Sequence, residues 1–173
     1  MNKTKLASEI RKYCYLKGRF RLRSGMNSEE YFDKYQFEAR PEILKSLARE
    51  MIPLLPDHTD FLAGLEMGGI PLATALSLET GIPCLFVRKE AKEYGTCQFA
   101  EGPAFRGKTL CLIEDVITTG GQVVASTQAL RSAGAIINTV VCAIYRGEGS
   151  AHPIEKAGLV MRPLFTAAEI RKS

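Results

Sequence analysis

The fold is decided by Leu110-Cys111-Leu112-Ile113-Glu114-Asp115-Val116-Ile117-Thr118-Thr119-Gly120-Gly121-Gln122. The first four residues form a short, continuously apolar run, which is typical of a strand that is covered on both faces. Two adjacent carboxylates follow, and then hydroxyl-bearing residues and glycines that open a helix. This order predicts a strand of a parallel sheet that runs into the carboxylates at its carboxyl end, where α/β proteins bind their ligands.

Regular segments on both sides of this stretch alternate in type. β-rich apolar runs occupy residues 61–65, 83–87, 109–113 and 139–145. Apolar residues at helical spacing mark 6–13, 44–51 and 123–130, and a further helix opens at 64–71. The resulting order is α, α, β, α, β, loop, β, α, β, which predicts an α/β domain with a mostly parallel central sheet flanked by helices.

Two segments break the alternation and are predicted to be loops. Residues 18–36 are rich in Gly, Ser, Arg and aromatic residues and precede the sheet. Residues 92–107 contain three glycines and a proline with little periodicity, and so long a loop in a compact domain is usually functional or mobile. Near the end, Thr166-Ala-Ala-Glu169 forms a capping box that opens a last helix, which is either a stub or packs on another part.

Length and composition limit the class of protein. The 173 residues suffice for one buried core but not comfortably for two, so a single domain over 1–173 is expected. The net charge is +4 with Lys and Arg scattered along the chain, which favours a small anionic ligand over nucleic acid. No apolar run reaches the roughly 18 residues that span a bilayer, and the N-terminus lacks a signal-peptide pattern, so a cytoplasmic protein without a membrane partner is expected.

The thiol and imidazole side chains suggest neither a disulfide framework nor a metal site. The five cysteines include no C-x-x-C pair, and three of them (Cys84, Cys111 and Cys142) fall inside apolar runs, where small buried hydrophobic side chains are expected. His58 and His152 have no second ligand at a suitable spacing.

The chemistry of residues 114–122 suits a ribose phosphate. Backbone N–H groups at a helix N-terminus bind a phosphate, glycines leave room for it, and the hydroxyls of Thr118 and Thr119 add donors. Glu114 and Asp115 can accept hydrogen bonds from ribose hydroxyls and place negative charge near a sugar that becomes cationic in the transition state. The alternative is a solvated acidic turn without a ligand.

This stretch resembles the phosphoribosyl pyrophosphate signature of the type I phosphoribosyltransferases. A second segment, Phe86-Val-Arg88-Lys89-Glu-Ala-Lys92-Glu-Tyr94-Gly95, is similar to the Arg-Lys-Glu-x-Lys-x-His-Gly segment of the orotate phosphoribosyltransferases. The resemblance implies that Arg88, Lys89 and Lys92 bind the pyrophosphate leaving group, which needs dense positive charge. Tyr94 replaces the family's His, and a phenol donates a hydrogen bond but carries no positive charge. Taken alone, these basic residues would form a solvated face.

Two further matches concern the pyrimidine. Leu22-Arg23-Ser24-Gly25 and the pair Tyr31-Phe32 resemble the family's Leu-Lys-Ser-Gly and aromatic pair, which implies that they bind orotate. Ile144-Tyr-Arg146-Gly-Glu148 resembles the family's Asp-Arg-x-Glu segment, whose Arg pairs with the orotate carboxylate through a guanidinium fork. Thr118 is expected beside the same ring. An ordinary N-terminal hairpin and a solvent-facing arginine are the alternatives.

Two glycine-bearing segments have different interpretations. Gly64-Leu-Glu-Met-Gly68-Gly69-Ile-Pro71 resembles the family's pyrophosphate loop, although the family often has Lys or Arg at the position of Gly68. The loop is therefore expected to bind phosphate through its backbone, together with Arg88 and Lys92. Gly102-Pro-Ala-Phe-Arg-Gly107-Lys108-Thr109 fits the P-loop pattern, but it begins a strand instead of a helix, which argues against a nucleotide triphosphatase.

The resemblance runs from about Leu6 to Thr166. It implies transfer of ribose 5-phosphate from phosphoribosyl pyrophosphate to orotate, with Lys92, Glu114 and Asp115 as catalytic residues and Mg²⁺ bound through the substrate, not directly by protein. It also implies an N-terminal hood segment over 1–36, a flexible active-site loop over 92–107, and a homodimer with shared active sites. The expected contacts to phosphoribosyl pyrophosphate are Arg88, Lys89, Lys92, Tyr94, Glu114, Asp115, Val116, Ile117, Thr118, Thr119, Gly120, Gly121 and Gln122. A phosphoribosyltransferase for another nucleobase and a non-catalytic regulator of the same fold are the open alternatives.

Overall fold

The structure is a computed structural model that describes residues 1–21, 25, 27–90, 99–147 and 152–173. Its helices are α1 (Lys3–Cys14), α2 (Tyr35–Glu38), α3 (Pro41–Met51), α4 (Gly69–Thr80), α5 (Gly121–Ser132), α6 (His152–Lys156) and α7 (Ala167–Lys172), with a 3-10 turn, η1, at Ile52–Leu54. Its strands are β1 (Tyr15–Arg21), β2 (Asn27–Phe32), β3 (Phe61–Leu65), β4 (Cys84–Val87), β5 (Ala100–Glu101), β6 (Thr109–Ile117), β7 (Ile136–Tyr145) and β8 (Val160–Thr166).

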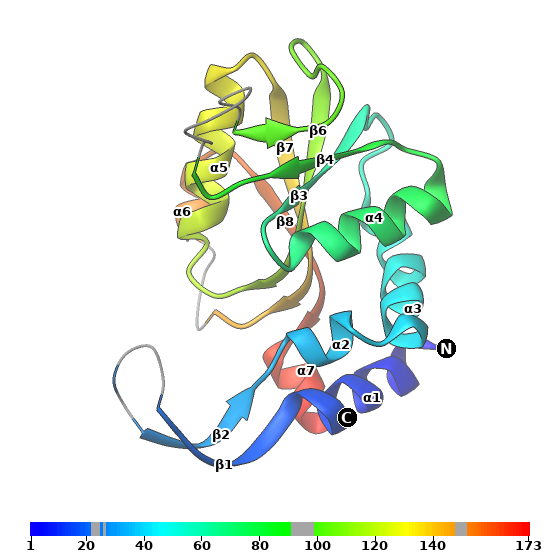
Figure 1. Cartoon of the computed structure of the whole chain (residues 1–173), viewed down its shortest axis with the longest axis vertical. Helices are drawn as coiled ribbons and strands as arrows, with labels where there is room; N and C mark the ends of the chain where they lie inside the picture. The colour runs from blue at the N-terminus through cyan, green and yellow to red at the C-terminus, as the bar shows by residue number, and fades with distance from the viewer. Residues whose placement is uncertain (22–24, 26, 91–98, 148–151) are drawn as a thin grey trace.

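Six of these strands form one central sheet in the order β5-β4-β3-β6-β7-β8 (Figure 1). β4, β3, β6, β7 and β8 pair in parallel, and β5 pairs with β4 antiparallel. Helices α4, α5 and α6 lie in the connections between successive parallel strands. The predicted α/β class with a mostly parallel sheet is therefore confirmed.

The strand order reverses in the middle of this sheet. From β3 the chain passes to β4 on one side, and it then returns to β6 on the other side of β3, from which β7 and β8 continue outward. In open α/β sheets, the crevice outside the carboxyl ends of the strands at such a reversal is where ligands bind. The turns that leave β3 and β6 therefore flank the expected site.

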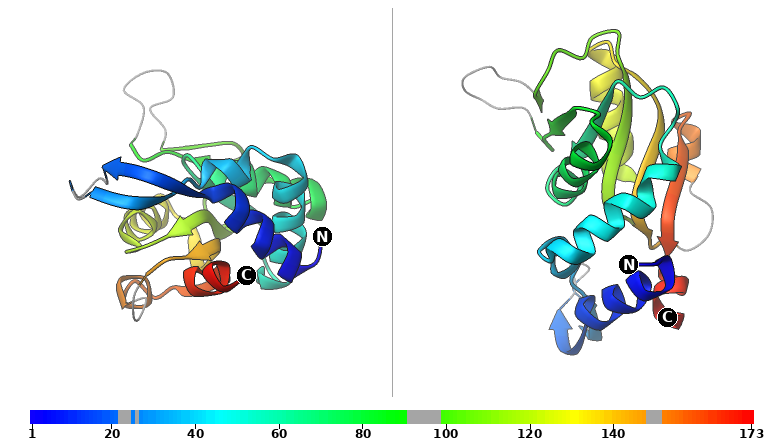
Figure 2. Two further views of the ribbon diagram at one scale, coloured as in Figure 1. Left: turned by 90° about the horizontal axis from the view of Figure 1, so that it is seen from below. Right: turned by 90° about the vertical axis from the view of Figure 1, so that its right-hand side faces the viewer.

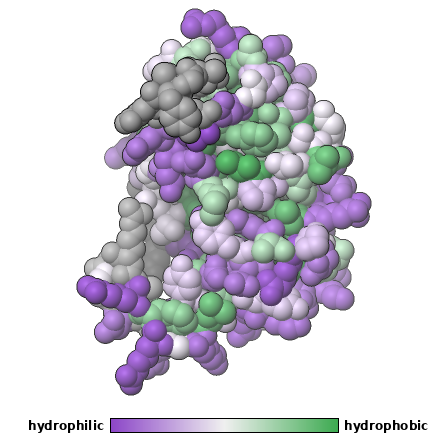
Figure 3. Space-filling model, in the orientation of Figure 1, coloured by the Kyte–Doolittle hydropathy of each residue, from purple (hydrophilic) through white to green (hydrophobic). Residues whose placement is uncertain are grey.

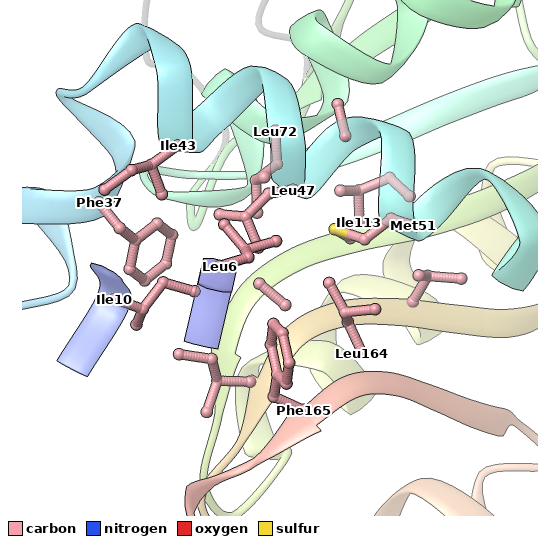
Figure 4. Close-up of a cluster of buried hydrophobic side chains, with 14 of the residues drawn as sticks. Leu6, Ile10, Phe37, Ile43, Leu47, Met51, Leu72, Ile113, Leu164 and Phe165 are labelled. Atoms are coloured by element: carbon pink, nitrogen blue, oxygen red, sulfur yellow. The ribbon is translucent and has the colours of Figure 1, made fainter. Parts of the chain in front are cut away.

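Both faces of the sheet are covered, because successive side chains of each strand enter opposite cores. Cys111, Ile113 and Val141 pack with α1, α2, α3, α4 and α7, in the cluster whose larger members Figure 4 shows. Leu110, Leu112 and Val140 pack with α5 and α6 instead. Continuous apolar runs in these strands follow directly from burial on both faces.

The prediction of a loop over residues 18–36 is wrong. β1 and β2 form an antiparallel hairpin, a two-stranded sheet separate from the central one, and α2 follows it. Figures 1 and 2 show the hairpin extending away from the central sheet. Its strands carry charged residues on exposed positions, so the apolar alternation that marks a half-buried strand is missing. Contacts between aromatic rings hold it instead, with the Tyr15 and Phe32 rings 5.0 Å apart.

The predicted loop over residues 92–107 is only partly described, since residues 92–98 lie outside the described part of the chain. In the remainder, Ala100–Glu101 forms β5, so an unbroken loop is incorrect. A two-residue strand is too short to leave a periodic signal. Gly107 turns with a φ of 75°, and β6 begins at Thr109. The P-loop letters therefore lead into a strand, as the sequence indicated.

The C-terminal end adds an edge strand that the sequence did not predict. β8 contains Arg162 and Pro163, which interrupt its apolar pattern, and an edge strand tolerates proline because one side needs no ladder hydrogen bond. The capping box at Thr166 and Glu169 is present and opens α7. Ile170 of this helix is fully buried in the core that contains α1, so α7 is docked and not a free stub.

The cysteines behave as small hydrophobic side chains. Cys14, Cys111 and Cys142 are buried, and Cys84 is partly buried. Burial raises the pKa of the Cys14 and Cys111 thiols to about 12, so both are protonated at neutral pH. Within the described ranges, no helix is both long and apolar enough to cross a membrane.

We predict that Ile170→Ala lowers the free energy of unfolding by roughly 2–5 kcal/mol, because it leaves a cavity between α7 and the core. Urea denaturation measures the change. Arg171→Ala, at the exposed neighbouring position, is the matched control and should change stability by less than about 0.5 kcal/mol. Equal effects of the two substitutions would show that α7 is not docked.

Candidate active site

A cavity of about 320 Å³ lies at the strand-order reversal. It is lined by Lys34, Tyr35, Glu66, Met67, Lys89, Glu114, Val116, Ile117, Thr118, Thr119, Gly120, Gly121, Gln122 and Val123. The lining thus unites the turn after β6, the turn after β3 and Lys89, which follows β4. Three segments that the sequence analysis singled out separately meet in one cavity.

The turn from β6 into α5 has the form of a phosphate site. Thr118 and Thr119 are exposed, and Gly120 adopts the left-handed region with a φ of 78°. A Cβ at Gly120 would also lie 2.6 Å from Cγ1 of Ile154, so glycine is required on two grounds. No side chain caps α5, which leaves the first N–H groups of a twelve-residue helix directed at the cavity.

The two carboxylates occupy different environments. β6 continues to Ile117, so Glu114 and Asp115 lie within the strand and not just beyond it. Glu114 lines the cavity and is 7% exposed, whereas Asp115 is 0% exposed and lies behind the lining. Asp115 Oδ1 accepts a hydrogen bond from the Val116 N–H at 2.6 Å, and Glu114 Oε1 accepts one from the Asp115 N–H at 3.1 Å.

Asp115 is held by two residues that the sequence analysis did not identify. Lys34 Nζ lies 2.6 Å from Asp115 Oδ2, and the Glu38 side chain is hydrogen-bonded to Asp115. Lys34 directly precedes α2, and Glu38 ends it. The available signal was weak: both residues lie close behind the predicted aromatic pair, in a segment too short to show helical periodicity.

The four titratable groups of this cluster, Lys34, Glu38, Glu114 and Asp115, have pKa values shifted from their ordinary values. Burial and the hydrogen bond to Asp115 raise the pKa of Glu38 to about 9, and burial also raises the pKa of Glu114 well above its usual range. Burial acts in the same direction on Asp115, but hydrogen bonds from Glu114 and Glu38 and the Lys34 ammonium lower its pKa overall. Burial would lower the pKa of Lys34, yet Asp115 raises it. The arrangement therefore combines an ionised Asp115, a charged Lys34 and a protonated Glu38, beside a Glu114 whose pKa is raised.

Gly68 is required by the same cluster. A Cβ at this position would lie 1.8 Å from Asp115 Oδ2 and 2.6 Å from Glu38 Oε1. No side chain can therefore leave the backbone here while Asp115 and Glu38 keep their places. This steric limit explains why the chain departs from the basic residue that the resembling loops often carry at this position.

The structure describes two of the three basic residues that are expected to bind pyrophosphate. Lys89 lines the cavity, and its backbone N–H donates to Glu66 Oε1 at 2.7 Å, which ties the end of β4 to the turn after β3. Arg88 is not among the lining residues, and its Nε lies 3.2 Å from Glu101 Oε1 of β5. Lys92 and Tyr94 lie outside the described residues, and their roles stay predictions.

The residues expected to bind orotate lie on the hairpin and at the end of β7. The Arg146 guanidinium lies 5.0 Å from the centre of the Phe32 ring, so two separate motifs come together. Phe32 is buried and packs edge-on against Tyr15, whereas Tyr31 is exposed beside Phe20. Arg23 lies outside the described residues. The orotate contacts remain predictions.

Comparison with known proteins shows which family the chain belongs to. Residues 34–161 match the phosphoribosyl transferase domain family. The chain is 57% identical to an orotate phosphoribosyltransferase of Nocardioides sp., over 95% of this chain and 92% of that one. Its fold matches the crystal structure of Mycobacterium tuberculosis orotate phosphoribosyltransferase in complex with Fe(III) dicitrate with a TM-score of 0.87, at 29% identity over 97% and 98% of the two chains. The complex of the same enzyme with phosphoribosyl pyrophosphate gives a TM-score of 0.83 at 26% identity, over 98% of both chains.

The chain therefore belongs to the phosphoribosyltransferase family, with the type I fold. Within that family it groups with the orotate phosphoribosyltransferases.

We predict that the pH dependence of stability reports the Glu38 proton. Folded Glu38 stays protonated up to a pH of about 9, whereas the unfolded residue ionises near its ordinary pKa of 4.5. Folded Glu38 therefore binds more protons than unfolded Glu38 within this window, and it lowers the free energy of unfolding as pH rises, by at most about 1.4 kcal/mol per pH unit. Urea denaturation across the window measures the slope.

Glu38→Gln is the comparison variant, since an amide keeps a donor for Asp115 and does not titrate. Its stability should fall less steeply with pH than that of the wild type. Superimposable pH profiles of the two proteins would show that Glu38 is not the group that holds the proton.

Proposed function

We propose that this protein transfers ribose 5-phosphate from phosphoribosyl pyrophosphate to orotate, giving orotidine 5'-monophosphate and pyrophosphate. One observation carries the proposal: a single cavity at the strand-order reversal combines the Thr118–Gly121 turn, the Glu114 carboxyl group and the Lys89 segment. These are the parts that a sugar phosphate with an anionic leaving group requires. The relatives named orotate phosphoribosyltransferase support the same conclusion.

The protein's contribution to catalysis is position and charge. The bond between ribose C1 and the diphosphate oxygen breaks, the orotate ring nitrogen loses its proton to solvent as it forms a bond to C1, and C1 is cationic in between. N–H groups of the 118–121 turn hold the 5'-phosphate, so that the sugar is fixed while its two ends react. Glu114 and Asp115 accept hydrogen bonds from the ribose hydroxyls, and Lys89 with Lys92 draws the leaving group away.

Mg²⁺ is proposed to bind through the substrate. In the described part of the chain, no group of three or more His, Cys, Asp or Glu side chains is placed to hold a metal ion. Mg²⁺ keeps several waters and is often bound by one or two carboxylates together with substrate phosphates. Glu66 and Glu114 are the lining carboxyl groups on which such a hydrated ion could rest, and its charge would neutralise the diphosphate.

A cytoplasmic homodimer with shared active sites is part of the proposal. Most residues of α4 are apolar, and its Leu78 is 84% exposed, beside the exposed Thr74 and Glu79. Figure 3 shows hydrophobic residues gathered in the region of this helix. We expect a second copy of the chain to cover the exposed Leu78 side chain.

We predict that the purified protein, with Mg²⁺ and phosphoribosyl pyrophosphate, consumes orotate and leaves uracil, adenine, guanine and hypoxanthine unchanged. A fixed guanidinium at Arg146 pairs with a carboxylate that these other bases lack. Loss of the ultraviolet absorbance of orotate measures the reaction. Consumption of another base instead of orotate would be compatible with the fold but would contradict orotate as the substrate.

We predict that subunits with different defects restore each other's activity. Lys92→Ala and Glu114→Gln should each cut turnover by about 10² or more, because the first removes a positive charge from the leaving group and the second removes a carboxyl group that contacts the ribose. If Lys92 acts in the neighbouring subunit's site, a mixed dimer holds one site with both defects and one with neither. Co-refolding the two inactive variants should then recover activity.

Lys156→Ala, on the exposed surface of α6, is the control and should leave turnover unchanged. No recovery in a mixture shown by ultracentrifugation to contain dimers would mean that each site is built from one chain.

A further inference from the structure

Positive charge is scarce on the side of the cavity where the diphosphate must lie. Among the lining residues that the structure describes, the cations are Lys34 and Lys89, and Glu66 and Glu114 carry carboxyl groups. The turn from β3 into α4 contributes Gly68 and no cationic side chain. A diphosphate carries several negative charges, so the cation that approaches this turn has a large effect on its binding.

Lys34 is the side chain that reaches this turn. Its Nζ lies 2.6 Å from Asp115 Oδ2, and a Cβ on Gly68 would lie 1.8 Å from the same oxygen. The ammonium, the carboxylate and the loop backbone therefore converge at the N-terminus of α4. The Lys34 side chain is still 31% exposed and lines the cavity, so it can turn toward a ligand without unfolding its surroundings.

Asp115 has enough other partners to release Lys34. The Val116 N–H donates to Oδ1, and the protonated Glu38 side chain donates to the same carboxylate. A buried carboxylate that keeps two hydrogen bonds remains stable while its ammonium partner moves. Asp115 has no exposed surface, so its carboxylate cannot accept a hydrogen bond from a ribose hydroxyl while Lys34 is bound to it. Departure of Lys34 would uncover the side of Asp115 that the ammonium now blocks.

We propose that Lys34 binds the diphosphate of the ribosyl donor, exchanging its ion pair with Asp115 for the leaving group and freeing Asp115 for the ribose hydroxyls. The inference rests on the proposed function and adds to it a substrate-binding residue outside the motifs at 86–95 and 110–122. Lysine suits this exchange, because a compact ammonium on a flexible four-carbon stem can change partners with little backbone movement.

The test measures, by calorimetry, how tightly the protein binds two fragments of the donor. Lys34→Met should weaken binding of magnesium pyrophosphate by roughly 10- to 100-fold, as expected for a lost charge-assisted hydrogen bond. Binding of ribose 5-phosphate should change much less, and Lys34→Arg should recover most of the pyrophosphate affinity. Lys45→Met, on the exposed face of α3, is the matched control and should bind both ligands normally.

An equal loss for both ligands, or no loss for pyrophosphate, overturns the proposal, since Lys34 would then serve only to neutralise Asp115. Because Lys34→Met leaves a buried carboxylate unpaired and can fail to fold, the pair Asp115→Asn and Lys34→Met/Asp115→Asn repeats the comparison without that charge. The double variant should bind pyrophosphate more weakly than Asp115→Asn by a similar factor, and equal binding again overturns the proposal. A wild-type protein that binds pyrophosphate but consumes no orotate refutes the proposed function alone.

Discussion

A fully buried carboxylate, that of Asp115, is the constraint on which the rest of the site depends. A charge removed from water costs several kcal/mol unless partners replace the lost hydration. Here the replacement comes from the backbone of β6, the Lys34 ammonium and the carboxyl groups of Glu38 and Glu114. Since Lys34 and Glu38 flank α2, the carboxylate fixes that short helix against the sheet. The hairpin that precedes α2 is thereby positioned as well.

The same carboxylate links the fold to its chemistry. A parallel sheet whose strand order reverses between β3 and β6 gives two turns that face one another, and α4 and α5 start from them. Asp115 lies between those turns, since it borders Gly68 on one side and Glu114 on the other. Both carboxyl groups are buried, but only Glu114 lines the cavity, since successive side chains of a strand point to opposite faces. One β-strand therefore supplies both a fully buried anion and a carboxyl group that faces the cavity.

The sequence predicts those parts of the molecule that have a strong local signal. The strands at 61–65 and 109–113 and the helix at 123–130 are continuous or periodic, because burial on the sheet faces selects apolar side chains. The phosphate turn at 118–121 is recognisable from its glycines. The hairpin, β5 and β8 could not be predicted. The hairpin carries charged side chains, β5 has only two residues, and Pro163 interrupts the apolar pattern of β8. The partnership of Lys34 and Glu38 with Asp115 could not be predicted, since the residues are about 80 positions apart in the chain and meet only through tertiary packing.

Gly68 limits the routes by which this site can change. Any substitution there that adds a side chain collides with Asp115 and Glu38 in their present positions. To move the cation from Lys34 to the turn after β3, a descendant would have to repack Glu38 or Asp115 and gain a basic residue at 68 together. A basic residue at 68 alone would collide with Asp115 and Glu38, so the two changes depend on each other. Two charge arrangements that support the same reaction can therefore be separated by a mutational barrier, and a lineage that has adopted one of them tends to keep it.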